Sequence, residues 1–170
     1  VIATSGDRIL DRRLADCGGK GLFAKEIHEA LLDGRVDLAV HSLKDLETEL
    51  PPGIVLACTL KREDARDALV LGAGCLPRGA HIGSSSVRRQ AQLLHARPDL
   101  SVETIRGNVQ TRLGRVKGGE FDASLLAIAG LKRLGLEAEA QVVIGPEHML
   151  PAACQGIIGI TCRADDAELL

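Results

Sequence analysis

The chain has almost no aromatic residues: its 170 residues include no Trp and no Tyr, and Phe23 and Phe121 are the only two Phe. Proteins that bind single-stranded nucleic acid stack bases on aromatic side chains, so this composition argues against that class. The formal net charge of −2 argues the same way, because phosphate-backbone binders carry an excess of Lys and Arg. We therefore expect no nucleic-acid partner, and any positive surface must be built locally from a few arginines.

Long apolar runs and paired cysteines are missing as well. No apolar run approaches the ~20 residues that span a bilayer, so we expect no membrane partner. The five cysteines are widely spaced and form no C-x-x-C pair, which indicates neither a zinc site nor a disulfide framework. The histidines have no metal-ligand spacing either, so we expect no metal. Reduced thiols and a cytoplasmic location are the simplest interpretation.

What the chain does contain is a regular alternation of short apolar strands and amphipathic helices. Such an alternation favours βαβ units, mostly parallel sheets and therefore the α/β fold class. The expected strands cover 36–40, 54–60, 81–83, 101–105, 122–127, 141–144 and 157–162, and a further short apolar run covers 68–71. The expected helices cover 21–33, 85–96, 108–117 and 129–134.

Two stretches look like domain boundaries: the charged segment 61–67 and the Pro/Ala/Gly-rich segment 150–156. They predict a first domain of residues 1–60 and 157–170 and a second domain of residues 61–156. A cleft between two such domains is a favoured ligand site. The chain begins without Met and ends on 166–170, which resembles the opening of a helix, so we interpret it as a fragment.

The segment His41-Ser42-Leu43-Lys44-Asp45 directly follows a predicted buried strand. Open α/β sheets bind their ligands at the carboxyl ends of such strands, which makes Lys44 and Asp45 candidate functional residues. Taken alone, an exposed pair on an ordinary loop explains the pattern equally well.

Arginines gather at two predicted helix starts. After the serines of 84–86, Arg88 and Arg89 occupy a first helical turn, where their charge opposes the helix dipole. Binding of an anion would offset this cost; the alternative is that both side chains point into solvent. Arg106 and Arg112 flank the second start, at Gly107-Asn108. Four arginines suit a ligand with several carboxylates, which arginine can bind with two parallel hydrogen bonds.

Five segments together resemble the porphobilinogen deaminase (hydroxymethylbilane synthase) family, in order and in spacing, over essentially the whole chain. They are Gly18-Gly19-Lys20-Gly21-Leu22-Phe23, Val40-His41-Ser42-Leu43-Lys44-Asp45, Gly83-Ser84-Ser85-Ser86-Val87-Arg88-Arg89-Gln90, Arg106-Gly107-Asn108-Val109-Gln110-Thr111-Arg112-Leu113 and Ala129-Gly130-Leu131-Lys132-Arg133-Leu134-Gly135. The resemblance implies two periplasmic-binding-protein-like (type II) domains with an interdomain cleft, and a third, C-terminal domain that this chain lacks.

The same resemblance implies a cytoplasmic, monomeric transferase of tetrapyrrole (heme) biosynthesis. Such an enzyme condenses four units of porphobilinogen, its small-molecule substrate, into hydroxymethylbilane, releases ammonia at each step and uses a covalent dipyrromethane cofactor as primer. By resemblance Asp45 is the catalytic carboxylate. The implied cofactor-binding residues are Asp7, Lys44, Ser86, Arg88 and Arg89, and the implied substrate-binding residues are Lys20, Phe23, Arg106 and Arg112.

Three departures from the family pattern are visible. Leu46-Glu47 replaces the usual apolar residue and Pro, and Cys154 stands where the family more often has a smaller residue. The cysteine that attaches the cofactor normally follows a Gly-Gly pair, and none of the five cysteines does, so we expect the attachment site outside this chain and the fragment itself to be inactive.

Two other functions compete with this interpretation. A non-catalytic two-domain module that binds a small carboxylate would share the fold, but a pure anion binder gains nothing from Asp45. A nucleotide-binding enzyme is disfavoured because Gly18-Gly19-Lys20-Gly21 has neither the P-loop nor the dinucleotide-binding spacing.

Overall fold

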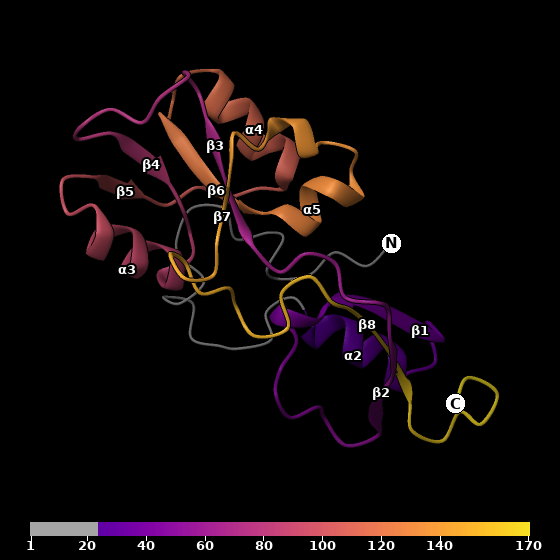
Figure 1. Cartoon of the computed structure of the whole chain (residues 1–170). Coiled ribbons are helices and arrows are strands. Elements are labelled where there is room, and N and C mark those ends of the chain that lie inside the picture. Colours follow the sequence, from indigo (N-terminus) through magenta and orange to yellow (C-terminus); the bar gives the residue numbers. More distant parts are fainter. Residues whose placement is uncertain (1–23) are drawn as a thin grey trace. The chain divides into compact units, whose positions relative to one another are not determined.

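The computed structural model describes residues 24–170 of the chain. By their internal contacts these residues divide into two compact units. Unit 1 contains 24–63 and 156–170, and unit 2 contains 64–155. The chain therefore leaves unit 1, builds unit 2 as one continuous segment, and returns (Figure 1).

In unit 1 one helix packs on a three-stranded sheet. The elements are α2 (Lys25–Leu32), β1 (Leu38–Ser42), the short 3-10 helix η2 (Leu43–Asp45), β2 (Ile54–Thr59) and β8 (Ile158–Arg163). The strand order is β1-β8-β2 and both pairs are antiparallel. The core consists of Leu31 from α2, Ala39 from β1 and Ile54 from β2. The returning strand β8 is thus the central strand of this sheet, and β1 and β2 flank it.

Unit 2 is built on a five-stranded sheet of order β5-β4-β6-β3-β7. Its strands are β3 (Asp67–Leu71), β4 (His81–Gly83), β5 (Ser101–Glu103), β6 (Ala123–Ala127) and β7 (Val142–Ile144). Its helices are α3 (Val87–Ala96), α4 (Val109–Lys117), α5 (Ile128–Arg133) and the 3-10 helix η3 (Glu137–Glu139). The expected strand–helix alternation is present, which confirms the α/β class.

Strand direction follows the prediction in only part of this sheet. β4 runs parallel to both β5 and β6, as βαβ units require. β3 runs antiparallel to β6 and β7, and the pairs of β8 with β1 and β2 in unit 1 are antiparallel as well. β3 and β8 directly follow the two points where the chain passes from one unit to the other, so neither continues a βαβ repeat. The expectation of mostly parallel sheets therefore holds for β5-β4-β6 and not for the crossover strands.

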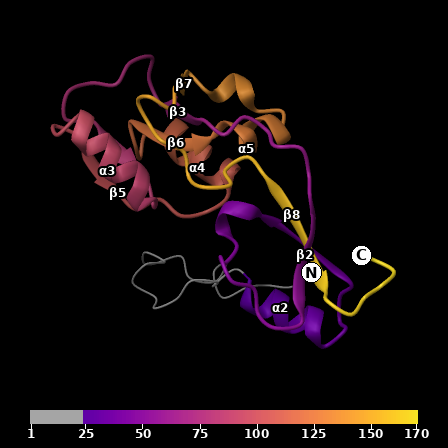
Figure 2. The same cartoon turned by 60° about the horizontal axis from the view of Figure 1, so that its bottom comes forward.

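Helices cover both faces of the sheet of unit 2 (Figures 1 and 2). Along β6, Leu126 packs in a cluster with residues of α4 and α5, whereas its neighbour Leu125 packs in a cluster with Leu93 of α3. Successive side chains of a strand point to opposite faces, which explains this division. The result is an α/β/α layer arrangement in which every residue of β6 from Ala123 to Leu126 is buried.

Candidate functional site

The candidate site of unit 2 lies where β4 and β5 end and α3 and α4 begin. The Ser84 N–H donates to the Glu103 carbonyl at 2.8 Å, and the Ser85 hydroxyl donates to the Ile105 carbonyl. The two loops are therefore neighbours at one edge of the sheet, the edge at which parallel strands place their ligands. The four arginines predicted from the sequence belong to these two loops and the helices that follow them: Arg88, Arg89, Arg106 and Arg112.

The start of α3 is fixed by a cap. Ser86 is the N-cap residue, and its hydroxyl accepts a hydrogen bond from the Arg89 N–H at 3.4 Å. This places Arg88 and Arg89 in the first turn, as predicted. Both side chains reach Asp67, the first residue of β3, whose side chain is 0% exposed.

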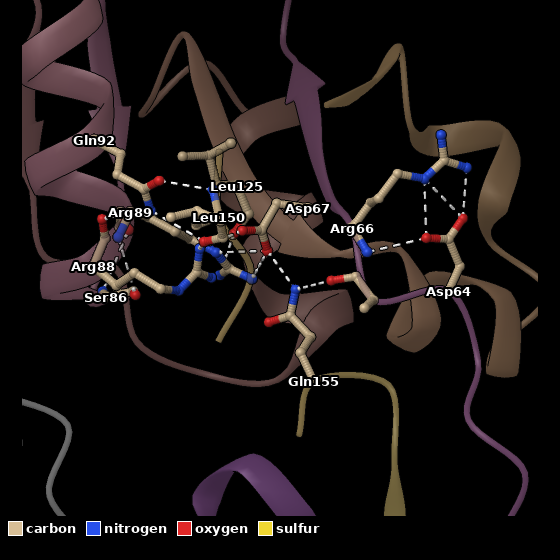
Figure 3. A network of polar contacts seen from close by, with 12 residues as sticks. Asp64, Arg66, Asp67, Ser86, Arg88, Arg89, Gln92, Leu125, Leu150 and Gln155 are labelled. Carbon is tan, nitrogen blue, oxygen red and sulfur yellow. Dashed lines mark hydrogen bonds and ion pairs between the residues drawn. The ribbon is translucent and has the colours of Figure 1, made fainter. Parts of the chain in front are cut away.

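The two oxygens of the Asp67 carboxylate have different partners (Figure 3). Oδ1 accepts from Arg89 Nε at 3.1 Å, from Arg89 Nη2 at 2.7 Å and from Gln155 Nε2 at 2.9 Å. Oδ2 lies 2.7 Å from Arg88 Nη1. The remaining end of Arg89, Nη1, donates to the Leu125 carbonyl at 2.8 Å. Arg89 is therefore engaged with protein acceptors on all three nitrogens.

Burial alone would raise the pKa of Asp67. The ion pairs with Arg88 and Arg89 and the hydrogen bond from Gln155 outweigh this effect and hold the pKa below its ordinary value. The carboxylate is thus charged at neutral pH, and two guanidinium groups share it. One positive charge remains in excess. Arg88 is the more exposed of the two arginines, with 24% of its side chain accessible against 6% for Arg89.

The returning segment of unit 2 completes this network. The Leu150 carbonyl accepts from Arg88 Nη1 at 2.5 Å and from Gln92 Nε2 at 3.1 Å, and the Leu150 N–H donates to Gln92 Oε1 at 2.7 Å. Gln155, which is fully buried, also donates from Nε2 to the Ala65 carbonyl at 2.6 Å. The beginning of α3, the beginning of β3 and the segment 150–155 are therefore held together by polar contacts (Figure 3).

The start of α4 is held by a helix cap, a glycine turn and an arginine hydrogen bond. Asn108 caps the helix by accepting the Thr111 N–H at 2.9 Å. Gly107 has φ +109°, and a Cβ placed there would lie 2.7 Å from Thr111 Cγ2, so the turn requires glycine. Arg112 Nε donates to the Gly107 carbonyl at 2.9 Å, and Arg106 is half-buried.

In unit 1, Lys44 and Asp45 lie in η2, directly after β1, as the sequence predicted. The Leu43 N–H donates to the Ile157 carbonyl at 3.0 Å and anchors this turn beside the start of β8. Asp45 is exposed and Lys44 is half-buried. Asp45 therefore carries a carboxylate that a ligand can reach.

Two histidines support the segment that carries Asp45. His41 Nε2 lies 2.9 Å from the Thr161 hydroxyl, and the rings of His41 and His28 have centroids 6.0 Å apart. Burial lowers the pKa of both. They are therefore neutral at pH 7 and act in packing. Glu47, one of the departures from the family pattern, places Oε2 3.5 Å from Nδ1 of the buried His28.

Sequence reasoning missed Asp67 and Gln155. One signal was available for Asp67: an acidic residue that opens the apolar run 68–71 must be buried with that strand and needs a cationic partner. No comparable signal marks Gln155. The predictions for Asp7, Lys20 and Phe23 lie outside the described residues.

Among residues 24–170 there is no group of three or more His, Cys, Asp or Glu side chains that could hold a metal ion. Within the same range no helix has the length and apolar character needed to cross a membrane. The cysteines described there are free thiols; Cys162 is buried, and Cys58, Cys75 and Cys154 are exposed.

The fold is that of a periplasmic-binding-protein-like α/β protein. The periplasmic substrate-binding protein of an ABC transporter from Coxiella burnetii is similar in structure, with a TM-score of 0.51 at 19% identity, over 84% of this chain and 71% of that one. Residues 1–170 match the family model described as "Porphobilinogen deaminase, dipyromethane cofactor binding domain". The chain belongs to the porphobilinogen deaminase family, whose cofactor is dipyrromethane.

Curated relatives agree with this assignment. The porphobilinogen deaminase of Sorangium cellulosum is 58% identical over 98% of this chain and 57% of its own length. The chloroplastic porphobilinogen deaminase of rice (Oryza sativa subsp. japonica) is 54% identical over 100% of this chain and 49% of its own length. The chain thus spans about half of the length of the curated relatives it matches.

Proposed function

We propose that the protein containing this chain condenses four porphobilinogen units into hydroxymethylbilane and releases ammonia at each step. The observation that carries this proposal is the excess positive charge of Arg88 and Arg89 on one buried carboxylate, at the sheet edge that also carries the loop of Arg106. Porphobilinogen and its products bear acetate and propionate groups, and guanidinium groups bind such carboxylates better than lysines do.

The residues of the described chain fit the dipyrromethane cofactor by their chemistry. Lys44, Ser86, Arg88 and Arg89 supply ammonium, hydroxyl and guanidinium donors for its carboxylates, with Arg88 as the more exposed arginine and Arg89 acting mainly through its charge. When bound, the cofactor supplies the pyrrole end from which the chain is elongated. We assign Arg106 and Arg112 to the substrate carboxylates, Lys20 and Phe23 to substrate binding, and Asp7 to the cofactor.

Asp45 is the catalytic residue of this proposal. Loss of ammonia from the aminomethyl group of porphobilinogen leaves an electron-poor azafulvene. An exposed carboxylate stabilises the positive charge that develops on its pyrrole nitrogen. The same carboxylate can accept the proton that leaves the ring when the new carbon–carbon bond has formed.

The cysteine that carries the cofactor is proposed to lie outside this chain. None of the five cysteines follows a Gly-Gly pair. By itself the 170-residue chain is then an inactive part of a monomeric, cytoplasmic enzyme. Its arginines would still attract pyrrole carboxylates, but without a covalent primer no elongation starts.

Asp45→Asn in the full-length protein tests the catalytic assignment. The substitution is nearly isosteric on an exposed turn, so the fold should persist while ammonia release falls by several orders of magnitude. Glu49→Gln, a second exposed carboxylate of the same loop, is the matched control and should release ammonia at the normal rate. Near-normal ammonia release by folded Asp45→Asn would remove Asp45 from the reaction.

A further inference from the structure

We propose that Asp67 is a positioning residue for ligand binding: its Oδ2 holds the Arg88 guanidinium in the orientation that receives a ligand carboxylate. The proposal rests on the proposed function, which assigns Arg88 to the dipyrromethane cofactor. It goes beyond that assignment, because it concerns Asp67, whose side chain is 0% exposed and to which the proposed function gives no ligand contact.

The contacts of Arg88 use only one end of its guanidinium group. Nη1 forms an ion pair with Asp67 Oδ2 at 2.7 Å and donates a hydrogen bond to the Leu150 carbonyl at 2.5 Å. Asp67 Oδ2 is buried and has no hydrogen-bond donor of its own among the described residues, so the Arg88 charge is its partner. No described residue accepts a hydrogen bond from Nε or Nη2 of Arg88. These two nitrogens form the edge of the guanidinium that binds a carboxylate with two parallel hydrogen bonds. Asp67 thus fixes one end of the group and leaves the bidentate edge for the ligand.

Arg89 shows what the same edge does when the carboxylate belongs to the protein. Its Nε and Nη2 both donate to Asp67 Oδ1, at 3.1 and 2.7 Å. Arg89 and Gln155 therefore fix the carboxylate of Asp67, and the carboxylate in turn fixes Arg88. The orientation of Arg88 therefore depends on a carboxylate that Arg89 and Gln155 already hold in place.

Simple electrostatics and positioning predict opposite effects of removing the Asp67 charge. A carboxylate close to an anion site repels the anion, so its loss should tighten binding. If Asp67 instead orients Arg88, its loss weakens binding even though a negative charge has gone. The sign of the effect therefore separates the two accounts.

Asp67→Asn in the full-length protein is the direct test. Oδ1 of Asp67 accepts from three N–H donors, so in the Asn variant the amide oxygen should occupy that position. The amide NH₂ group then faces Arg88 Nη1, and two donors without an acceptor repel each other. We expect apoprotein incubated with hydroxymethylbilane to gain its two-pyrrole adduct at least tenfold more slowly, measured by intact mass, and the KM for porphobilinogen to rise. Asp64→Asn, whose carboxylate pairs with Arg66 instead, is the control and should load normally.

A double-mutant cycle excludes a merely structural role. In an Arg88→Gln background, Asp67→Asn should still lower the melting temperature but should slow loading no further, because the group through which Asp67 acts is gone. Loading that is unchanged or faster in Asp67→Asn, or an equal slowing in both backgrounds, overturns the proposal. If Asp67→Asn does not fold, Asp67→Glu keeps the charge but displaces it by one methylene, and slower loading is expected; unchanged or faster loading overturns the proposal.

A second readout does not depend on the cofactor. Phenylglyoxal modifies accessible guanidinium groups, and peptide mapping reports the modified residue. Releasing Nη1 from Asp67 should make Arg88 several-fold more reactive in Asp67→Asn but not in Asp64→Asn. If Arg88 reacts equally fast in wild type and in Asp67→Asn, the positioning role of Asp67 is contradicted. If the wild-type protein neither acquires the cofactor nor releases ammonia, the proposed function is contradicted instead, and the reactivity of Arg88 still decides whether Asp67 positions it.

Discussion

Replacing Arg89 by Met removes a buried cation from a buried carboxylate and should strongly destabilise unit 2. Asp67 is 0% exposed and the Arg89 side chain 6% exposed, so water cannot take over the lost contacts. Met has a similar length and is apolar, which keeps the packing of the stem. The Leu125 carbonyl loses its Arg89 donor in the same variant.

The size of the stability loss in Arg89→Met depends on which partners Asp67 and the Leu125 carbonyl keep. Removing one member of a buried ion pair costs about 3–5 kcal/mol when the other charge is left uncompensated. Here Asp67 keeps Arg88 and Gln155, which places the carboxylate contribution at the lower end. The unpaired carbonyl adds about 1 kcal/mol. We therefore expect a loss of about 3–4 kcal/mol in the free energy of unfolding.

Native-state hydrogen exchange measures this loss in the right part of the chain, since the amides of β3 and β6 report on unit 2 alone. Arg66→Met is the matched control: it breaks an ion pair with Asp64, but the Arg66 side chain is 46% exposed, so the exchange rates should not change measurably. Adding Asp67→Leu to Arg89→Met should recover part of the loss, because the buried charge goes too. A loss below about 1 kcal/mol for Arg89→Met would refute the reasoning.

Three further predictions concern other parts of the chain. Cys154 has φ +59°, the left-handed region, so Cys154→Gly should raise the melting temperature while the β-branched Cys154→Val lowers it, with the two variants about 1–2 kcal/mol apart. Burial holds the pKa values of His28 and His41 below 6.5, so on acidification the unfolded chain binds protons before the folded protein does. The free energy of unfolding should therefore be highest above about pH 6.5 and fall as the pH drops below 6.5. In His28→Gln this fall should be smaller. Intact-mass spectrometry of the 170-residue chain after incubation with hydroxymethylbilane should show no stable gain of two pyrrole units; an adduct abolished by mutating Cys17 or Cys154 would contradict the proposed attachment site.

Local signals in the sequence were sufficient for the helix starts. The caps at Ser86 and Asn108 depend on residues three positions away, so the sequence alone places α3 and α4. The position of Asp45 after a strand was likewise predictable, because a short apolar run bounded by turn residues marks β1. Each of these features is determined by residues that lie only a few positions apart in the sequence.

What could not be predicted depends on contacts between distant segments. Alternating strands and helices do not show that β3 runs antiparallel to β6, since hydrophobic pattern carries no information on strand direction. Asp67 and Arg89 are 22 residues apart, and Gln155 lies 88 residues from Asp67. Only the folded sheet brings these three together, so neither the buried network nor the unequal exposure of Arg88 and Arg89 could be read from spacing.

The structure also explains in a different way how the two arginines in the first turn of α3 are tolerated. Their charge opposes the helix dipole, and the sequence suggested that a bound anion offsets the cost. Much of that offset comes from within the protein, because the Asp67 carboxylate faces both guanidinium groups. A ligand therefore meets one excess positive charge instead of two, presented by Arg88 with its bidentate edge free of described acceptors. An internal carboxylate reduces the attraction for anions in general while it fixes the geometry for one carboxylate, so this edge of the sheet is suited to selecting a ligand by shape more than by charge.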